Sequence, residues 1–128
     1  MLILVTGGAA SGKSEHAERL VCEKAQSRLY LATMQPFGKS AEARIARHRA
    51  LRAGKGFATV ERTLDLANLR LSQQYDGILL EDLGNLLANE LFAPEGAGAG
   101  SAFDSIVAGV DNPVSYTHLR AHETRHDL

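Results

Sequence analysis

Several features that would indicate particular classes of protein are scarce in this sequence. Its 128 residues carry 14 basic and 15 acidic side chains, and a net charge of −1 provides no overall basic field for nucleic acid or a membrane surface. The one cysteine, Cys22, excludes a disulfide framework, and its helical surroundings predict a small buried apolar residue. No apolar run approaches the length of a membrane span, and no signal peptide precedes the first predicted strand, so we expect a cytoplasmic protein. The length favours one domain.

What the sequence does contain, near its start, is a phosphate-binding loop. An aliphatic run over 2–6 predicts a fully buried strand, and 14–26 predicts a helix. The spacing G-x-x-x-x-G-K-S between them is typical of a loop whose backbone N–H groups surround the phosphates of a nucleoside triphosphate. The nucleotide-binding residues predicted in this loop are Gly7, Gly8, Ala9, Ala10, Ser11, Gly12, Lys13 and Ser14. The alternative is a glycine-rich turn followed by a chance Lys-Ser, but strand, loop and helix all agree with the motif.

Three side chains have specific roles in this interpretation. Lys13 would reach the β- and γ-phosphates, and the Ser14 hydroxyl would bind Mg²⁺. Further along, the aliphatic strand predicted over 78–82 ends in Glu81 and Asp82. A carboxylate at the end of such a strand lies beside the phosphate loop and holds Mg²⁺ or its water, which favours Glu81. The alternative is that both acids simply cap the next helix.

The remaining segments alternate between strand and helix patterns. We expect strands over 28–33 and, at an edge, 57–60; helices over 41–52 behind an N-cap at Ser40, then over 63–71, 83–92 and 102–109; and a flexible loop over 96–101. This alternation predicts an α/β fold with a mostly parallel central sheet flanked by helices.

The helix predicted over 41–52 is strongly basic. Arg44, His48 and Arg52 are spaced i, i+4, i+8 and share a face, and Arg47 and Arg49 flank the histidine. Guanidinium groups disfavour a charged imidazole and bind phosphate. A neutral imidazole beside a triphosphate is a competent nucleophile at phosphorus. The residue pattern alone leaves open a solvated basic helix face with an incidental histidine.

The segments Leu2–Ala9, Ser11–Ser14, Leu29–Thr33, Arg44–Arg52, Thr59–Glu61, Ile78–Glu81 and Asn89–Leu91 together carry a family resemblance. With them, the chain resembles the bifunctional adenosylcobinamide kinase / adenosylcobinamide-phosphate guanylyltransferase of cobalamin biosynthesis over residues 1–110. The Arg-Ile-x-x-His block is the most discriminating piece. Three positions depart from the family pattern, namely Asp82 for a frequent Cys, Phe57 for a common Trp and Arg47 for a second His, and none is a proposed catalytic group.

The resemblance implies a P-loop NTPase (RecA-like) fold and two reactions in one site. In the kinase step a nucleoside triphosphate phosphorylates the aminopropanol hydroxyl of adenosylcobinamide. In the transfer step GMP moves from GTP, through a guanylyl-histidine, onto that phosphate. The site residues implied are His48, Lys13 and Glu81 for catalysis, Arg49, Arg52 and Glu61 with the loop for nucleotide binding, and Ser14 and Glu81 for Mg²⁺. The substrates implied are GTP, ATP and the corrinoid, and the assembly implied is a trimer, with neither nucleic acid nor membrane as a partner.

Two other functions stay open at this point. A simple P-loop kinase of a small molecule or nucleoside would need the same loop and carboxylate without nucleotidyl transfer. An inactive nucleotide-binding fragment would need the loop alone.

The end of the sequence departs from the resemblance. Family members continue with further strands, whereas Val114–Thr124 resembles a translated transposon-end sequencing adapter. We therefore expect 1–112 to be the N-terminal part of the nucleotide-binding kinase/guanylyltransferase domain, incomplete at its C-terminus and impaired in activity. We expect 113–128 to be a non-native tail, either disordered or a stray helix. The i, i+4, i+8 spacing of its three histidines (His118, His122 and His126) would then have no meaning for metal binding.

Overall fold

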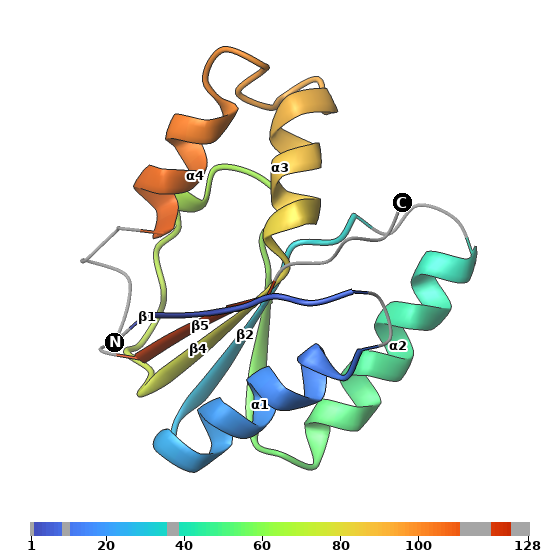
Figure 1. The fold of residues 1–128 in the computed structure, drawn as a ribbon, viewed down its shortest axis with the longest axis vertical. Coiled ribbons are helices and arrows are strands. Elements are labelled where there is room, and N and C mark those ends of the chain that lie inside the picture. Colours follow the sequence, from blue (N-terminus) through green and yellow to red (C-terminus); the bar gives the residue numbers. More distant parts are fainter. Residues whose placement is uncertain (1, 9–10, 36–38, 111–118, 124–128) are drawn as a thin grey trace.

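The computed structural model describes residues 2–8, 11–35, 39–110 and 119–123 (Figure 1). Its elements in chain order are β1 (Leu2–Val5), α1 (Lys13–Lys24), β2 (Arg28–Ala32), α2 (Lys39–Ala53), β3 (Phe57–Glu61), the 3₁₀ helix η1 (Leu66–Asn68), β4 (Gly77–Glu81), α3 (Leu83–Phe92), α4 (Ala102–Val110) and β5 (Leu119–Glu123). Strands and helices alternate through most of this order, as the sequence predicts.

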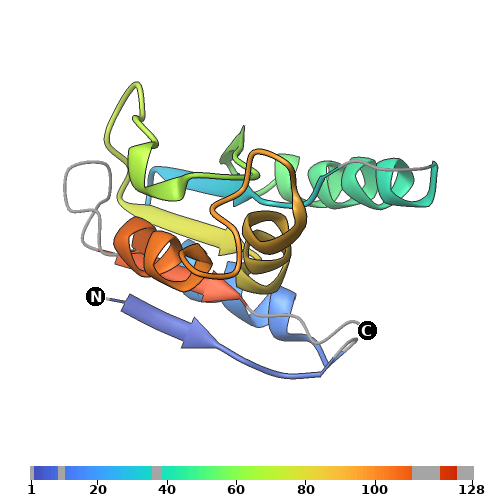
Figure 2. The same ribbon diagram turned by 90° about the horizontal axis from the view of Figure 1, so that it is seen from above.

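The strands form one sheet in the order β1-β5-β4-β2-β3, and every strand pair among the described residues is parallel. Figure 2 shows β1 on the outer side of the sheet beside β5. The predicted α/β fold with a parallel central sheet is therefore confirmed, as is the place of β3 at an edge. Because all strands run the same way, their carboxyl ends meet at one edge, where ligands bind in open α/β sheets.

Helices cover both faces of the sheet, with α3 and α4 above it and α1 below it in Figure 1. Side chains alternate between the faces along each strand. The face toward α1 buries Val5, Tyr30 and Leu79 with Ala17 and Val21 of the helix. The opposite face buries Leu29, Leu31, Ile78 and Leu80 under Leu66 and Leu86. Ala32 and Glu81 follow Tyr30 and Leu79 by two positions, so they lie on the same α1 face, at the carboxyl ends of β2 and β4.

The segment 63–71 was expected to be a helix, and that expectation is wrong. Only η1 is helical there, because Asp65 adopts a left-handed conformation with φ 55°. Its N–H donates to Glu90 Oε2 at 3.0 Å, and its carboxylate accepts from Asn68 Nδ2. Leu66 and Leu69 are nevertheless both buried. The apolar spacing therefore predicted correctly which side chains are buried, but not the backbone conformation.

The first strand is less buried than its aliphatic sequence indicates. Leu2 is 53% and Leu4 60% exposed, whereas Val5 is buried against α1. The reason is that β1 lies at the outer position of the sheet, where the face carrying Leu2 and Leu4 remains open. Two smaller expectations also fail: Cys22 is only half-buried, and α2 begins at Lys39, so Ser40 lies inside its first turn.

Residues 119–123 contradict the expectation of a disordered tail or a stray helix, because they form β5. This strand pairs with β1 on one side and β4 on the other, in continuous register from Leu119 to Glu123. A strand in this position satisfies the backbone N–H and C=O groups of both neighbours, a gain that depends little on which side chains it carries. His122 therefore belongs to a strand, and the helical histidine spacing does not apply, while His118 and His126 lie outside the described residues.

The buried carboxylate of Glu90 joins three segments above the sheet and should contribute strongly to stability. It accepts hydrogen bonds from the Asp65 and Ala97 N–H groups, each at 3.0 Å, and from the Ser105 hydroxyl at 3.1 Å. Glu90→Ala removes the shared acceptor of three part-buried hydrogen bonds, and we expect it to lower the free energy of unfolding by about 3 kcal/mol. Urea denaturation measures the loss. Glu95→Ala, at an exposed position, is the control and should change stability by less than about 0.5 kcal/mol. A similarly small change for Glu90→Ala would contradict this role.

Candidate functional site

The predicted site residues gather at the carboxyl edge of the sheet. The register aligns Glu81 of β4 with Ala32 of β2, and Ala32 with Glu61 of β3. The two carboxylates are therefore in one row on one face, their Cα atoms about 10 Å apart by two strand spacings. The phosphate-binding loop (residues 7–14) follows β1 at the same edge.

Two glycines of the loop lie where a side chain would be crowded or strained. A Cβ on Gly7 would lie 2.7 Å from Ser11 Oγ, which is too close for any side chain without a shift. Gly12 has φ +85°, a left-handed conformation that favours glycine. The loop closes through a hydrogen bond from the Ser11 N–H to Gly8 O at 3.3 Å. Ala9 and Ala10 lie outside the described residues.

Helix α1 begins immediately after this turn, with Lys13 as its first residue. Its N-cap, Gly12, makes no side-chain hydrogen bond to the helix, and the positive end of the helix dipole faces the loop, a position that suits an anion. Lys13 is buried, and its ammonium folds back to donate to Gly8 O at 3.2 Å. The lysine charge therefore lies over the loop rather than in solvent.

A short hydrogen bond joins the loop to β4. Ser14 Oγ donates to Glu81 Oε1 at 2.7 Å, and Glu81 is buried. This confirms the expectation that the carboxylate at the strand end lies beside the phosphate loop. A hydroxyl and a carboxylate are hard oxygen donors that suit Mg²⁺, which is usually held by one or two carboxylates together with substrate phosphates. Throughout the described part of the chain no three His, Cys, Asp or Glu side chains are grouped as they would be around a metal ion.

The two acids at the end of β4 have different surroundings. Asp82 is the N-cap of α3, and its Oδ1 accepts from the Asn85 N–H at 2.6 Å. Helix capping, the alternative function considered for both acids, therefore accounts for Asp82. Glu81 instead faces the loop through Ser14, which leaves it as the candidate for the metal and the nucleotide.

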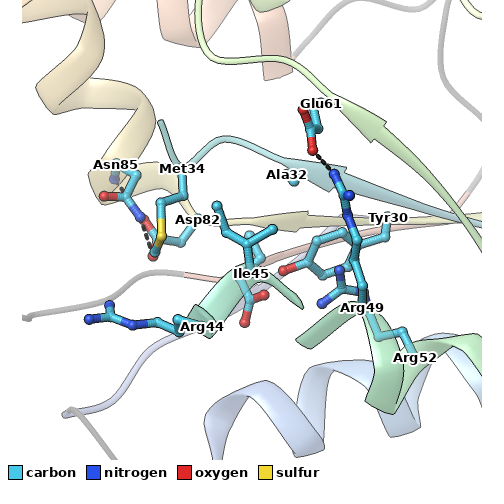
Figure 3. Close-up of a pocket in the computed structure, with 11 residues that line it drawn as sticks. Tyr30, Ala32, Met34, Arg44, Ile45, Arg49, Arg52, Glu61, Asp82 and Asn85 are labelled. Carbon is cyan, nitrogen blue, oxygen red and sulfur yellow. Dashed lines mark hydrogen bonds and ion pairs between the residues drawn. The ribbon is translucent and has the colours of Figure 1, made fainter. Parts of the chain in front are cut away.

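A pocket opens between α2 and the α1 face of the sheet, next to this pair (Figure 3). It is lined by Tyr30, Ala32, Met34, Arg44, Ile45, Arg49, Arg52, Glu61, Glu81, Asp82 and Asn85. Three of these residues are arginines of α2, so the pocket combines a cationic wall with the carboxylates at the strand ends. Such a wall suits the phosphates of a nucleotide.

Arg52 is the least solvated cation of the pocket. It is 2% exposed, and its guanidinium carbon lies 3.2 Å from the centroid of the Tyr30 ring. Burial lowers the pKa of Arg52 to about 10, which keeps it protonated at neutral pH. Among the described residues, its Nε and Nη1 have no hydrogen-bond partner. A desolvated cation with donors to spare is suited to an anion from the ligand.

The structure describes the side chain of Arg49 on α2 but not that of His48. Arg49 forms an ion pair with Glu61, and this pair links α2 to β3 across the pocket (Figure 3). His48 lies on α2, but its side chain is outside the described residues. Arg44 and Arg52, one turn before and one turn after it in the sequence, both line the pocket. Nucleotide binding by Arg49, Arg52 and Glu61 remains a prediction.

Sequence reasoning missed several lining residues, among them Tyr30, Met34, Ile45 and Asn85. Strand alternation could have found one of them, because Tyr30 is two residues before Ala32 on the strand that ends at this edge. The others follow from where α2 crosses the sheet, which no local pattern reports.

No helix in the described ranges is both long and apolar enough to cross a membrane.

Residues 3–121 match the family model described as cobinamide kinase / cobinamide phosphate guanyltransferase. The chain is 43% identical over 94 residues to the bifunctional adenosylcobalamin biosynthesis protein CobU of Escherichia coli (strain K12), and 43% over 95 residues to that of Salmonella typhimurium, which covers 72% and 73% of this chain. It is 42% identical over 80 residues, 62% of this chain, to the bifunctional adenosylcobalamin biosynthesis protein CobP of Pseudomonas aeruginosa. The chain spans about half the length of these relatives, 51%, 51% and 46%. It belongs to the cobinamide kinase / cobinamide phosphate guanyltransferase family.

Proposed function

We propose that this chain carries the nucleotide site of an enzyme that phosphorylates adenosylcobinamide and then transfers GMP from GTP to the product. One observation carries the proposal. The Ser14–Glu81 hydrogen bond of 2.7 Å joins a hydroxyl and a carboxylate at the phosphate loop, beside a pocket walled by arginines of the helix that bears His48, and this supports Mg²⁺ binding there. A phosphate site alone would support any P-loop kinase, whereas an arginine-lined pocket under a histidine-bearing helix supports transfer through that histidine.

In the kinase step the aminopropanol hydroxyl of the corrinoid attacks the γ-phosphorus of ATP or GTP. The new O–P bond forms as the bond to the β-phosphate oxygen breaks, the hydroxyl proton is released, and a nucleoside diphosphate leaves. Lys13 would hold the β- and γ-phosphates, and Ser14 and Glu81 would hold Mg²⁺. When bound, Mg²⁺ neutralises charge on the phosphate oxygens. The loop supplies positioning and electrostatic stabilisation, which are most of what phosphoryl transfer requires of a protein.

In the transfer step the neutral imidazole of His48 attacks the α-phosphorus of GTP. A nitrogen–phosphorus bond forms, the bond to the β-phosphate breaks, and pyrophosphate leaves. A phosphate oxygen of adenosylcobinamide phosphate then attacks the same phosphorus and releases the imidazole, which gives adenosylcobinamide-GDP. The covalent intermediate divides one difficult transfer into two easier ones. Arg44 and Arg52 would stabilise the charge on the transferring group and keep the imidazole neutral before attack.

The covalent step has a direct test. The chain is incubated with GTP labelled at its α-phosphate, and acid-labile, base-stable label on the protein is measured. We expect His48→Ala to lower labelling by at least about a hundredfold, because the nucleophile is gone. His16→Ala, at an exposed position of α1 outside the pocket lining, is the matched control and should keep the label.

The other outcomes separate the alternative functions. Phosphorylated corrinoid without labelled protein would contradict guanylyl transfer and leave a plain kinase. GTP binding that depends on Lys13, with neither product nor label, would contradict both steps and leave a non-catalytic nucleotide-binding module.

We also propose that 113–128 is non-native and that the relatives fill the position of β5 with residues of their own. The support is the likeness of Val114–Thr124 to a translated adapter sequence, whereas the matched range of the family model, which ends at residue 121, extends past Asn112 into this segment and argues for native sequence there. Sequencing the source DNA across codon 112 tests the proposal, and uninterrupted native coding sequence there would overturn it.

A further inference from the structure

Thr33 is a buried hydroxyl that the proposed chemistry does not use. It directly follows β2 and is completely buried. Its N–H donates to Glu81 O at 3.1 Å, which extends the β2–β4 pairing by one residue. It lies on the opposite face of the sheet from Tyr30 and the pocket, since it continues the row of Leu29 and Leu31. Thr33 therefore contacts the end of β4 from the face of the sheet opposite the pocket.

The hydroxyl of Thr33 makes two hydrogen bonds to a single residue at the end of β4. Oγ1 donates to Asp82 O at 2.8 Å and accepts from Asp82 N at 2.8 Å. Both backbone groups of Asp82 are thereby held by one side-chain atom, in the turn between β4 and α3. Asn89 fixes the other side of Thr33, because its Nδ2 donates to Thr33 O at 2.8 Å and to Thr63 O at 2.9 Å.

This turn adjoins the carboxylate that would bind the metal. Glu81 immediately precedes Asp82, and its carboxylate meets Ser14 Oγ at 2.7 Å. A shift or rotation of the Asp82 backbone is transmitted directly to Glu81, whereas the phosphate loop is anchored separately by β1 and α1. Groups that orient a metal ligand in this way typically change metal affinity about 10–100-fold when they are removed.

We propose that Thr33 is a positioning residue, whose hydroxyl holds the Asp82 backbone so that Glu81 and Ser14 bind the Mg²⁺ of a bound nucleoside triphosphate. The proposal rests on the proposed function only as far as Mg²⁺-dependent triphosphate binding. Valine has nearly the shape of threonine but can neither donate to Asp82 O nor accept from Asp82 N. Serine keeps the hydroxyl and loses only a methyl group. The comparison of these two replacements isolates the hydrogen bonds from the packing.

The test measures GTP affinity with a fluorescent GTP analogue, in a Mg²⁺ titration and in EDTA. We expect Thr33→Val to raise the half-saturating Mg²⁺ concentration about tenfold, with affinity in EDTA changed less than about twofold. Thr33→Ser should restore the Mg²⁺ response. Thr59→Val, at an exposed position of β3, is the matched control and should behave as the unmutated chain. If Thr33→Val does not fold, Thr33→Ala removes the same hydroxyl without the branched bulk and should give the same tenfold shift.

A double variant tests whether the effect passes through the carboxylate. Glu81→Gln should itself raise the Mg²⁺ requirement, and Thr33→Val added to it should raise the requirement no further. Equal losses of affinity in Mg²⁺ and in EDTA, additive losses in the double variant, or an unchanged Mg²⁺ response would each overturn the proposal. Absence of α-phosphate label on His48, with the Mg²⁺ shift present, would contradict guanylyl transfer and leave the role of Thr33 supported.

Discussion

Replacing Lys13 with alanine is expected to weaken GTP binding about a hundredfold or more. In the structure the buried ammonium already lies over the phosphate loop, where Gly8 O accepts from it at 3.2 Å. When a triphosphate enters, the ammonium exchanges this neutral acceptor for charged phosphate oxygens. Hydrogen bonds to charged groups contribute about 1.5–3 kcal/mol each, so two of them correspond to a factor of about 10²–10⁴ in affinity.

The measurement is a titration with a fluorescent GTP analogue in Mg²⁺. Lys24→Ala is the matched control, because it removes the same charge from the exposed last turn of the same helix. Thermal unfolding shows whether either variant alters the fold. An affinity of Lys13→Ala within about threefold of the unmutated chain, with the fold intact, would contradict nucleotide binding at this loop.

The loop and the carboxylate could be predicted from the sequence because each is a local pattern. At Gly12 a side chain would be strained, at Gly7 it would displace the Ser11 hydroxyl, and Lys13 and Ser14 follow at fixed spacing. The Ser14–Glu81 contact crosses 67 positions of sequence, but a parallel sheet brings strand ends together whatever the length of chain between them. Motif and topology together were therefore enough.

The basic residues of the pocket wall were predicted from the sequence, but the position of the wall could not be. Its position depends on how α2 crosses the sheet, which is fixed by contacts such as Arg52 on Tyr30 and the ion pair of Arg49 with Glu61. Neither contact has a sequence signal, because each joins different elements. The prediction of a helix over 63–71 was wrong for a related reason, because it depends on a contact between distant elements. Glu90 of α3 accepts from the Asp65 N–H and fixes a turn there.

Removing residues 113–128 is expected to leave β1 unpaired, so that it no longer folds together with the rest of the sheet. GTP binding should be lost with it. Within the described sheet β1 is paired with β5, and β5 in turn with β4. Without β5, strands β1 and β4 would stand two strand spacings apart, about 10 Å. The pairing of β5 with four residues of β1 and five residues of β4 would be lost. With roughly one hydrogen bond for each pair, at about 0.5–1.5 kcal/mol each, the loss exceeds about 4 kcal/mol. That is a large part of the stability of a typical domain.

Such a loss reaches the site because the phosphate loop is continuous with β1, while Glu81 belongs to β4. Thermal unfolding of 1–112 beside 1–128 measures the effect on the fold, and GTP titration measures the effect on the site. Ala121→Pro keeps the chain length and should reproduce most of the loss, since proline cannot donate to the ladder inside a central strand. Ser115→Pro, which lies before β5 in the sequence, is its control. A sharp transition and unchanged GTP affinity for 1–112 would show that β1 is held by α1 and the loop, and that pairing with β5 contributes little to the nucleotide site.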